Sequence, residues 1–174
     1  MQRKADSQNN HRRVYAASVK TPFANLGLWF QGRALAGIDF IEQDLLVQVD
    51  PGAEMTAEIE AMRELINSYC LNPFRRPHFD SELMPAGTEF QQKVWKALQD
   101  IPAGRIVTYG ELAKELNTSA RAVGNACRRN PIPVIIPCHR VVARAGIGGF
   151  SGATKGSMLN IKKWLLNHEG VQFS

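Results

Sequence analysis

The stretch Pro131-Ile132-Pro133-Val134-Ile135-Ile136-Pro137-Cys138-His139-Arg140-Val141-Val142 is the part of the sequence around which the rest can be organised. Its apolar run predicts a buried strand or core segment. Three prolines should keep the approach extended and stiff. A thiol, an imidazole and a guanidinium then follow in successive positions. A cysteine held beside a histidine is a candidate nucleophile, because the thiolate attacks and a base must take its proton.

Cys138 on its own would more often be an inert core residue, since buried free cysteines are common. Two cationic neighbours, His139 and Arg140, favour a chemical role. Adjacent side chains of an extended chain point to opposite faces. His139 can therefore assist Cys138 only if the chain turns here, or through a water molecule.

The composition is that of an ordinary soluble globular protein of 174 residues, with 44% hydrophobic and 21% charged residues. This length suits one large domain or two small ones. No apolar run could span a bilayer, and residues 1–13 are polar and lack a secretory h-region. We therefore expect no membrane partner and a cytoplasmic protein, or a nuclear one in a eukaryote.

The three cysteines, Cys70, Cys127 and Cys138, form no C-x-x-C pair. An odd count without pairing argues against a disulfide framework and a cysteine-rich zinc site, and fits a reducing compartment. The four histidines show no metal-ligand spacing. The sequence therefore predicts no metal site.

Charge is distributed unevenly along the chain. Residues 21–84 carry four Lys/Arg against ten acids, whereas residues 85–174 carry twelve against five. A basic half suggests a polyanionic partner. The alternative is a merely solubilising charge, because the net charge of the whole chain is only +5.

The N-terminal half predicts a small sheet and one helix. Strands are expected at 27–31 and 35–42, with a third candidate at 45–49. The apolar period then changes to three- and four-residue steps, which predicts a helix over 56–69. Its polar face should carry the acids Glu54, Glu58, Glu60 and Glu64. Residues 71–85 contain three prolines and predict a linker.

Four helices are expected in the C-terminal half. Thr88 with Gln91, and Thr108 with Glu111, are capping boxes that open the first two. The other two, at 120–129 and 158–168, should start after the caps Ser119 and Ser157, and Gly170 should end the last one.

The second and third of these helices, joined by a short turn, predict a helix-turn-helix. The pattern alone is weak, because many helix corners bind nothing. Small residues in the later helix would let its backbone approach a groove, where arginines meet phosphates or bases. The candidate DNA contacts are Arg121, Ala122, Asn125, Ala126, Arg128 and Arg129.

The expected fold class is thus α+β: a small N-terminal β-sheet with a helix, followed by a mainly helical C-terminal domain. We expect residues 1–13 to be a flexible tail, residues 14–85 to form the N-terminal domain with its linker, and residues 86–174 to form the C-terminal domain.

The heptapeptide Ile136-Pro137-Cys138-His139-Arg140-Val141-Val142 resembles the active-site signature of the O6-alkylguanine-DNA alkyltransferases. The likeness is strong over about residues 88–170. It is carried by the strings 88–95, 101–109, 121–129, 130–142 and 164–170. In the N-terminal half only the order of strands and helix is similar, and the resemblance implies a ribonuclease H-like unit there.

The resemblance implies that an alkyl group passes irreversibly from O6 of guanine to Cys138, once per molecule and without metal or cofactor. O4-alkylthymine is a further candidate substrate. The partner would be double-stranded DNA, bound by a monomer. His139 would act as base through a water molecule, oriented by Glu169, and Tyr109 would assist the leaving guanine. Arg121 would fill the gap left by the flipped base.

The resemblance also assigns supporting residues. Asn130 would brace the turn before the signature, and Pro133, Val142, Phe150 and Ser151 would line or support the base pocket. Phe150 stands where the family usually has tyrosine, and the segment 153–157 is longer than usual.

Two other functions stay open from the sequence. A cysteine hydrolase of another kind would use the same Cys and His, although no distant His and Asn/Asp signature accompanies them. A DNA-binding lesion sensor without efficient transfer is the second alternative, and the presence of Cys138 argues against it.

Overall fold

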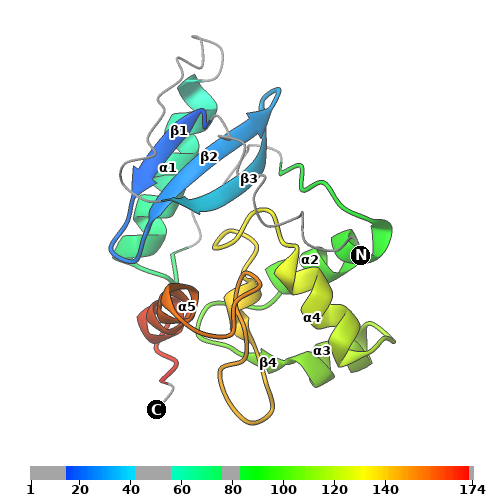
Figure 1. Cartoon of the computed structure of the whole chain (residues 1–174). Helices are drawn as coiled ribbons and strands as arrows, with labels where there is room; N and C mark the ends of the chain where they lie inside the picture. Colours follow the sequence, from blue (N-terminus) through cyan, green and yellow to red (C-terminus); the bar gives the residue numbers. More distant parts are fainter. Residues whose placement is uncertain (1–14, 42–55, 76–82, 173–174) are drawn as a thin grey trace, which may run out of the picture.

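The computed structural model describes residues 15–41, 56–75 and 83–172. Its upper part in Figure 1 is a small sheet with one helix, and its lower part is a group of short helices and loops. The fold class is therefore α+β, as expected. No helix in the described ranges is long and apolar enough to cross a membrane.

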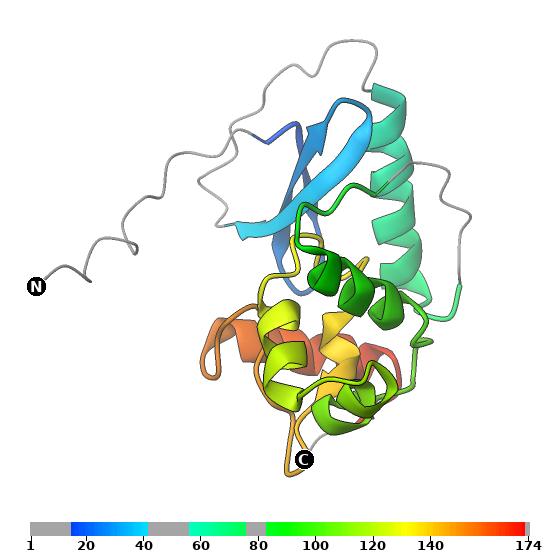
Figure 2. The same ribbon diagram turned by 90° about the vertical axis from the view of Figure 1, so that its right-hand side faces the viewer.

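The sheet is antiparallel, in the order β1 (Ala17–Lys20), β2 (Asn25–Gln31) and β3 (Ala34–Ile41). The helix α1 (Thr56–Leu71) packs along one face of it, as Figure 2 shows. The strands predicted at 27–31 and 35–42 are confirmed as β2 and β3. β1 was missed, because four residues are too short for a clear alternation. The candidate strand at 45–49 lies outside the described residues.

The helix predicted at 56–69 is confirmed as α1, but Glu58 is not on a solvated face. Only 6% of its surface is exposed, and its carboxylate pairs with Arg33, which lies between β2 and β3. The prediction of an acidic solvent face is wrong at this position. The guanidinium of Arg33 reaches the carboxylate from the turn between β2 and β3, and such a tertiary pairing leaves no trace in helical periodicity.

The C-terminal half contains α2 (Glu89–Gln99), β4 (Val107–Thr108), α3 (Tyr109–Glu115), α4 (Ala120–Arg128), the 3₁₀ helix η3 (Cys138–Arg140), β5 (Val141–Val142) and α5 (Ser157–His168). Both predicted capping boxes are present at the starts of α2 and α3. The Ser119 hydroxyl accepts the Ala122 N–H at 3.2 Å. Helices α3 and α4 lie in the order that a helix-turn-helix requires, while a DNA-binding role for them stays a prediction.

The start of α5 differs from the prediction. Gly156, with φ of 81°, precedes the helix, and Ser157 is its first residue and makes no capping hydrogen bond. At the other end Gly170 has φ of 80°, and its N–H and that of Val171 bond to the last turn. The predicted glycine ending is therefore confirmed.

Residues 131–137 are a core segment, as expected, but not an extended one. Ile132 and Ile136 are fully buried, Val134 has φ of 75°, and the Ile136 N–H bonds back to Ile132 O at 2.9 Å. Proline lacks the N–H that a sheet ladder needs. The Asn130 side chain supplies substitutes, donating to Ile136 O at 2.8 Å and accepting from Ile132 N at 3.0 Å. The segment is therefore a braced turn.

One hydrophobic cluster runs through both halves of the described chain. The Trp95 indole lies inside it and donates to Ala126 O at 2.9 Å, which ties α2 to α4. β3 is connected to the braced turn by a bond from Ile38 N to Pro131 O at 2.8 Å. The division of the chain at residue 85 stays a prediction.

We expect Leu98→Ala to lower the free energy of unfolding by about 2–5 kcal/mol, because a fully buried leucine leaves a cavity. Leu71→Ala is the matched control, since Leu71 is 85% exposed and should change stability by no more than about 0.5 kcal/mol. Urea unfolding of both variants measures this. Equal losses would contradict the position of the core.

Candidate active site

Cys138 begins η3, directly after the braced turn. Its N–H bonds to Ile136 O at 2.8 Å, and the Arg140 N–H bonds to Pro137 O at 3.0 Å. The chain therefore turns at the cysteine, which is the condition for His139 to assist it. The thiol is 4% exposed and the imidazole is fully buried.

Cys138 lines a cavity of about 190 Å³. The other lining residues are Tyr109, Gly124, Cys127, Arg128, Gly149, Phe150, Ser151, Gly152, Ala153 and Thr154. Two residues assigned to this pocket, Pro133 and Val142, do not line it. Val142 pairs with Thr108 between β5 and β4, and Pro133 belongs to the braced turn.

A larger cavity of about 1100 Å³ lies elsewhere, lined by residues of α1 and α2 and of the segments 83–85, 102–103 and 134–140, among others. Cys138 is not among its lining residues, although Arg140 is. The smaller cavity is therefore the one that a substrate must enter to meet the thiol.

His139 and Glu169 form a buried pair. The imidazole Nε2 lies 2.9 Å from Glu169 Oε1, and neither side chain has exposed surface. A carboxylate only accepts, so Nε2 carries the proton and Nδ1 keeps a free lone pair. Nδ1 is buried without a hydrogen-bond partner in the described part of the chain. Burial lowers the pKa of His139, although Glu169 opposes this, so the ring is a neutral base at pH 7.

Glu169 stays charged despite its burial. Burial by itself would raise its pKa, but hydrogen bonds from His139 and Arg140 outweigh that effect and hold the pKa of the carboxyl well below its usual range. Arg140 donates Nε to Oε2 at 2.9 Å and Nη2 to Oε1 at 2.8 Å. Gly104, with φ of 80°, adds its N–H to Oε2 at 3.2 Å. An acid at a helix C-terminus is explained by this pairing, and it is not a surface residue.

The thiol itself is not activated at rest. Burial raises the pKa of Cys138, and a hydrogen bond with the Asn130 side chain and the nearby Lys162 ammonium offset this only in part. A neutral thiol needs a base to become a nucleophile. The His139 imidazole has the protonation state for that task.

Tyr109 begins α3, and its ring lies on the wall of the same cavity. Its hydroxyl donates to Gly149 O at 3.4 Å, a long contact that a stronger acceptor could replace. Burial, followed by the two neighbouring thiols, raises the pKa of Tyr109. The phenol therefore remains a proton donor at neutral pH.

Phe150 is 3% exposed and lies both on the cavity wall and against Phe40 of β3, with ring centroids 5.7 Å apart. Ser151, with φ of 46°, lies beside it on the cavity wall. Phe150 therefore contacts the N-terminal sheet and presents an apolar ring to the cavity.

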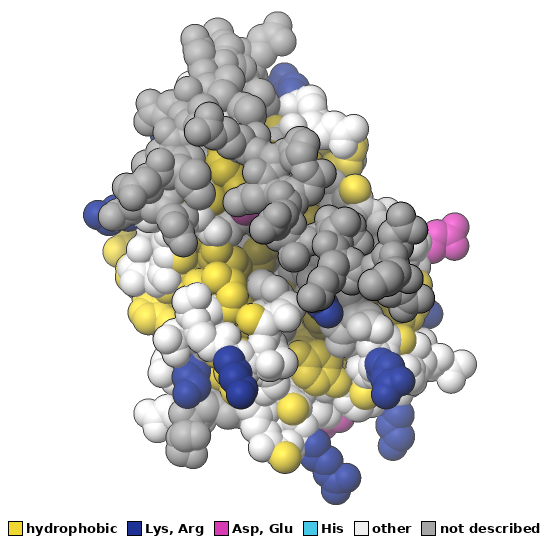
Figure 3. Space-filling model, viewed as in Figure 1, with side chains coloured by type: hydrophobic (Ala, Val, Ile, Leu, Met, Phe, Trp, Pro, Cys, Tyr) yellow, Lys and Arg dark blue, Asp and Glu magenta, His cyan; other side chains and the backbone are white. Residues whose placement is uncertain are grey.

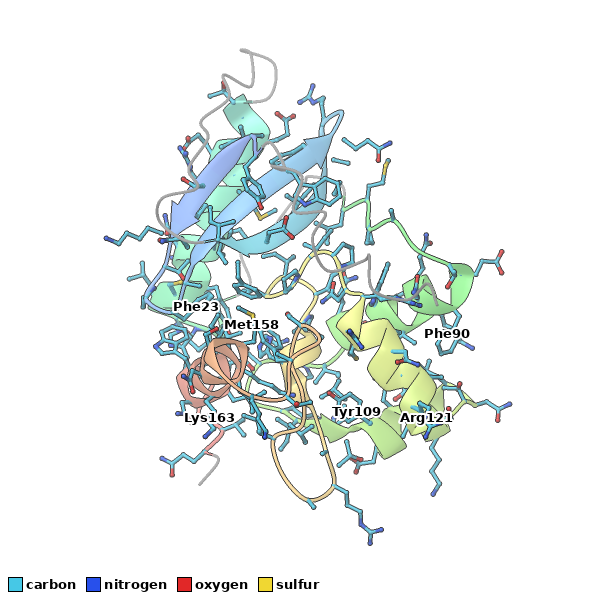
Figure 4. The ribbon with its side chains drawn as sticks, in the orientation of Figure 1. Phe23, Phe90, Tyr109, Arg121, Met158 and Lys163 are labelled. Atoms are coloured by element: carbon cyan, nitrogen blue, oxygen red, sulfur yellow. The ribbon has the colours of Figure 1, made fainter. Side chains whose placement is uncertain are left out.

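The arginines of α4 point outward. Arg121, Arg128 and Arg129 are exposed, and Arg128 also lines the cavity mouth. Figure 4 shows Arg121 on α4 and Tyr109 at the start of α3, and in Figure 3 Lys and Arg side chains dominate the charged groups in the lower part of the view. Asn125 is exposed and Ala122 half-buried. Ala126 differs from the prediction, because it is 1% exposed and faces Trp95 in the core.

Lys162 is a site residue that sequence reasoning missed. It is fully buried in α5, and its ammonium donates to Val141 O at 2.6 Å and Gly149 O at 3.0 Å. It thereby joins the strand after Cys138 to the cavity loop. The signal was its spacing, four residues after Met158 and three before Leu165, which places it on the inward face. The adjacent Lys163 obscured this signal, because two consecutive lysines are typical of an exposed surface.

Residues 89–171 match the sequence profile of the 6-O-methylguanine DNA methyltransferase family, DNA-binding domain. A methylated-DNA–protein-cysteine methyltransferase of Methanosarcina acetivorans is 37% identical over 162 residues, which span 90% of this chain and 99% of that protein. The chain belongs to the methylated-DNA–protein-cysteine methyltransferase family. The crystal structure of the Mycobacterium tuberculosis O6-methylguanine methyltransferase has a TM-score of 0.69 and 35% identity, and the match covers 87% of this chain and 90% of that one.

Other methylated-DNA–protein-cysteine methyltransferases match over a shorter region. The Salmonella typhimurium protein is 46% identical over 92 residues, which cover 51% of this chain and 51% of that protein. A second structure of the M. tuberculosis protein, solved in complex with DNA, has a TM-score of 0.66 and 36% identity, and the match covers 87% of this chain and 90% of that one. The described residues contain no group of three or more His, Cys, Asp or Glu that could hold a metal ion.

We expect the buried Lys162 to make stability rise with pH. Burial lowers its pKa from 10.5 to about 8 in the folded protein. Between these values the unfolded chain binds more protons, so the free energy of unfolding increases as pH rises through that window, by about 3 kcal/mol. The test compares urea unfolding of wild type and Lys162→Met below pH 8 and near pH 10.5.

Lys163→Met is the matched control, because Lys163 is the exposed neighbour on the same helix. The difference between wild type and Lys162→Met should grow with pH, whereas that between wild type and Lys163→Met should stay constant. Parallel pH profiles of stability for all three proteins would contradict a lowered pKa of the buried Lys162.

Proposed function

We propose that this protein is a DNA repair enzyme that transfers an alkyl group from O6-alkylguanine in double-stranded DNA to its own Cys138. The observation that carries the proposal is the arrangement of Cys138 on the wall of a small cavity, next in the chain to a neutral His139 that is paired with a charged Glu169. The relatives' names, methylated-DNA–protein-cysteine methyltransferase, support the same reaction.

The position of the thiol implies base flipping. Guanine O6 in a stacked duplex cannot meet a sulfur that is 4% exposed inside the protein. The base must therefore leave the stack and enter the cavity, at a cost of a few kcal/mol. Phe150 offers a flat wall for the ring, and the exposed Arg121 at the start of α4 can fill the vacated position.

In the reaction, His139 Nδ1 takes the Cys138 proton through a water molecule. The sulfur attacks the alkyl carbon, a carbon–sulfur bond forms, the carbon–oxygen bond breaks, and its electron pair stays on guanine. Tyr109 donates its hydroxyl proton to the leaving guanine and recovers one from the imidazolium, which Glu169 stabilises until then, so the thiol proton ends on guanine. The product thioether is stable, so each molecule acts once.

DNA binding is assigned to the exposed side of α4, with Arg121, Arg128 and Arg129 as charged contacts and Ala122 and Asn125 beside them. Of these residues Arg128 also lines the cavity, so phosphate contacts along α4 would bring the lesion close to Cys138. A relative solved with DNA supports this partner.

We propose that the protein acts as a monomer in the compartment of the DNA, the cytoplasm or, in a eukaryote, the nucleus. O4-alkylthymine remains a second candidate substrate.

We expect the mass of the protein to increase by one methyl group, located on Cys138, after incubation with a duplex that contains O6-methylguanine. Cys138→Ala should abolish transfer while keeping affinity for the duplex, because the phosphate contacts lie on α4. Intact mass and peptide mapping measure transfer, and a filter or anisotropy assay measures binding.

Cys127→Ala is the matched control, since Cys127 lines the same cavity and is not assigned a part in the chemistry. It should still accept one methyl group. Duplex binding without any gain in mass would instead identify a lesion sensor, and repeated turnover would contradict a stable thioether.

We expect Arg121→Ala to slow transfer from duplex DNA by about tenfold, because the vacated position in the stack is no longer filled. Transfer from a free O6-alkylguanine base should be nearly unchanged, since it needs no flipping. Single-turnover rates on the two substrates are compared in the same preparation, and equal losses on both would refute the role of Arg121.

A further inference from the structure

Tyr69 reaches the candidate active site from the N-terminal half of the chain. It lies in the last turns of α1, and its hydroxyl is 2.9 Å from Glu169 Oε1, although the two residues are 100 positions apart. Because a carboxylate only accepts, the phenol is the donor. Burial, then the charge and hydrogen bond of Glu169, raise the pKa of Tyr69, so the phenol keeps its proton at every working pH.

The contact falls on the oxygen that His139 uses. Glu169 Oε1 receives Tyr69 Oη at 2.9 Å, His139 Nε2 at 2.9 Å and Arg140 Nη2 at 2.8 Å. A carboxylate oxygen has about two lone pairs, so these donors share the same electron density. The hydrogen bond from the Tyr69 hydroxyl draws negative charge away from Glu169 Oε1. The carboxylate therefore interacts less strongly with the His139 imidazole.

The end of α1 is held at this position by a second contact. His168, the residue before Glu169, donates Nε2 to the Tyr69 carbonyl at 2.8 Å. The Tyr69 ring stands edge-on to the His168 ring, with centroids 5.4 Å apart, and His168 stacks on Trp164 at 4.7 Å. Figure 1 shows the lower end of α1 above α5. His168, the last residue of α5, and the C-cap Glu169 therefore both contact Tyr69, which fixes where its hydroxyl points.

We propose that Tyr69 is a positioning residue for the reaction at Cys138, holding the Glu169 carboxylate and setting how strongly it acts on His139. This inference rests on the proposed function. It means that the N-terminal half, outside the profile match at 89–171, supplies part of the reactive centre. The larger cavity is lined by both Tyr69 and Arg140, so the outer side of this hydrogen-bond network borders that space.

The direct test is Tyr69→Phe in the full chain, which removes the hydroxyl and keeps the ring. With one donor lost, more carboxylate charge acts on His139 and favours its protonated form. We expect the acidic limb of the single-turnover pH–rate profile to move to higher pH. Transfer on the acidic side should slow by about tenfold. An unshifted profile would overturn the proposal, whatever the absolute rate.

The matched control is Tyr15→Phe. Tyr15 also lies in the N-terminal half and donates to a carboxylate, Asp39 Oδ2 at 3.2 Å, but it has no hydrogen bond to Glu169. Its pH profile should follow that of wild type. A shift of the same size in Tyr15→Phe would show that any loosening of this half moves the profile, and would overturn a specific role for Tyr69.

A double-mutant cycle separates positioning from packing. In a Glu169→Gln background the neutral amide no longer holds the imidazolium, so Tyr69→Phe should have no further effect on the profile. An undiminished effect would overturn the proposal. Should Tyr69→Phe fail to fold, difluorotyrosine at position 69 keeps the hydroxyl and makes it a stronger donor. The limb should then move to lower pH, and no movement would equally overturn the proposal.

Different results would refute the transfer reaction and the role of Tyr69. Wild-type protein that gains no alkyl group would refute the proposed function itself. Wild-type protein that reacts normally, with a Tyr69→Phe profile identical to it, would refute only the role of Tyr69. The protonation of His139 can also be followed by nitrogen NMR without substrate, and the same upward shift in its titration is expected in Tyr69→Phe.

Discussion

Glu169 carries a negative charge with only 1% of its surface exposed, and the architecture around Cys138 depends on how that charge is satisfied. An unpaired buried carboxylate would be destabilising by several kcal/mol or would take up a proton. Here its donors come from Tyr69, Gly104, His139 and Arg140. Tyr69 belongs to α1, Gly104 to the 102–105 loop, and His139 and Arg140 to η3. Hydrogen bonding to one carboxylate therefore brings these three segments together at the end of α5.

A second buried charge, of opposite sign, lies on the same helix. Lys162 and Glu169 are seven residues apart, about two turns of α5, and therefore project from similar faces. Lys162 binds the strand that follows Cys138 and the loop that forms the cavity, while Glu169 binds the residues just after the thiol. The reactive segment is thus attached to α5 on both sides. Burial raises the pKa of the Cys138 thiol and the Lys162 ammonium offsets this only in part, which leaves proton removal to His139.

The braced turn shows how a proline-rich apolar segment can be buried without a sheet. Prolines remove donors, and a single amide, Asn130, bonds to two of the remaining backbone groups, Ile132 N and Ile136 O. A side chain that satisfies both ends of a turn also fixes its shape, and the shape aims Cys138 at the cavity. The braced turn, the cavity and the residues Cys138, His139 and Glu169 are therefore structurally connected. Side-chain hydrogen bonds, in place of regular secondary structure, hold this segment.

Much of this protein was determined by local sequence. The capping boxes at Thr88 and Thr108, the strands β2 and β3, the glycine ending of α5 and the sequence around Cys138 depend on neighbours within a few residues, where side-chain chemistry and backbone preference act directly. The pairing of Glu169 with His139 was expected only from the resemblance to the alkyltransferase family.

Other features were decided only by tertiary structure. Residues 131–137 form a turn where an extended segment was expected, and Glu58 pairs with Arg33 of the sheet. Lys162 points inward, and Tyr69 bonds to Glu169, which is 100 residues away in the chain. These contacts join positions far apart in the chain, and their strength comes from burial, which raises the value of each hydrogen bond to a charge. A sequence records the residue types that can make such bonds, whereas only the folded chain brings the partners together and removes the water between them.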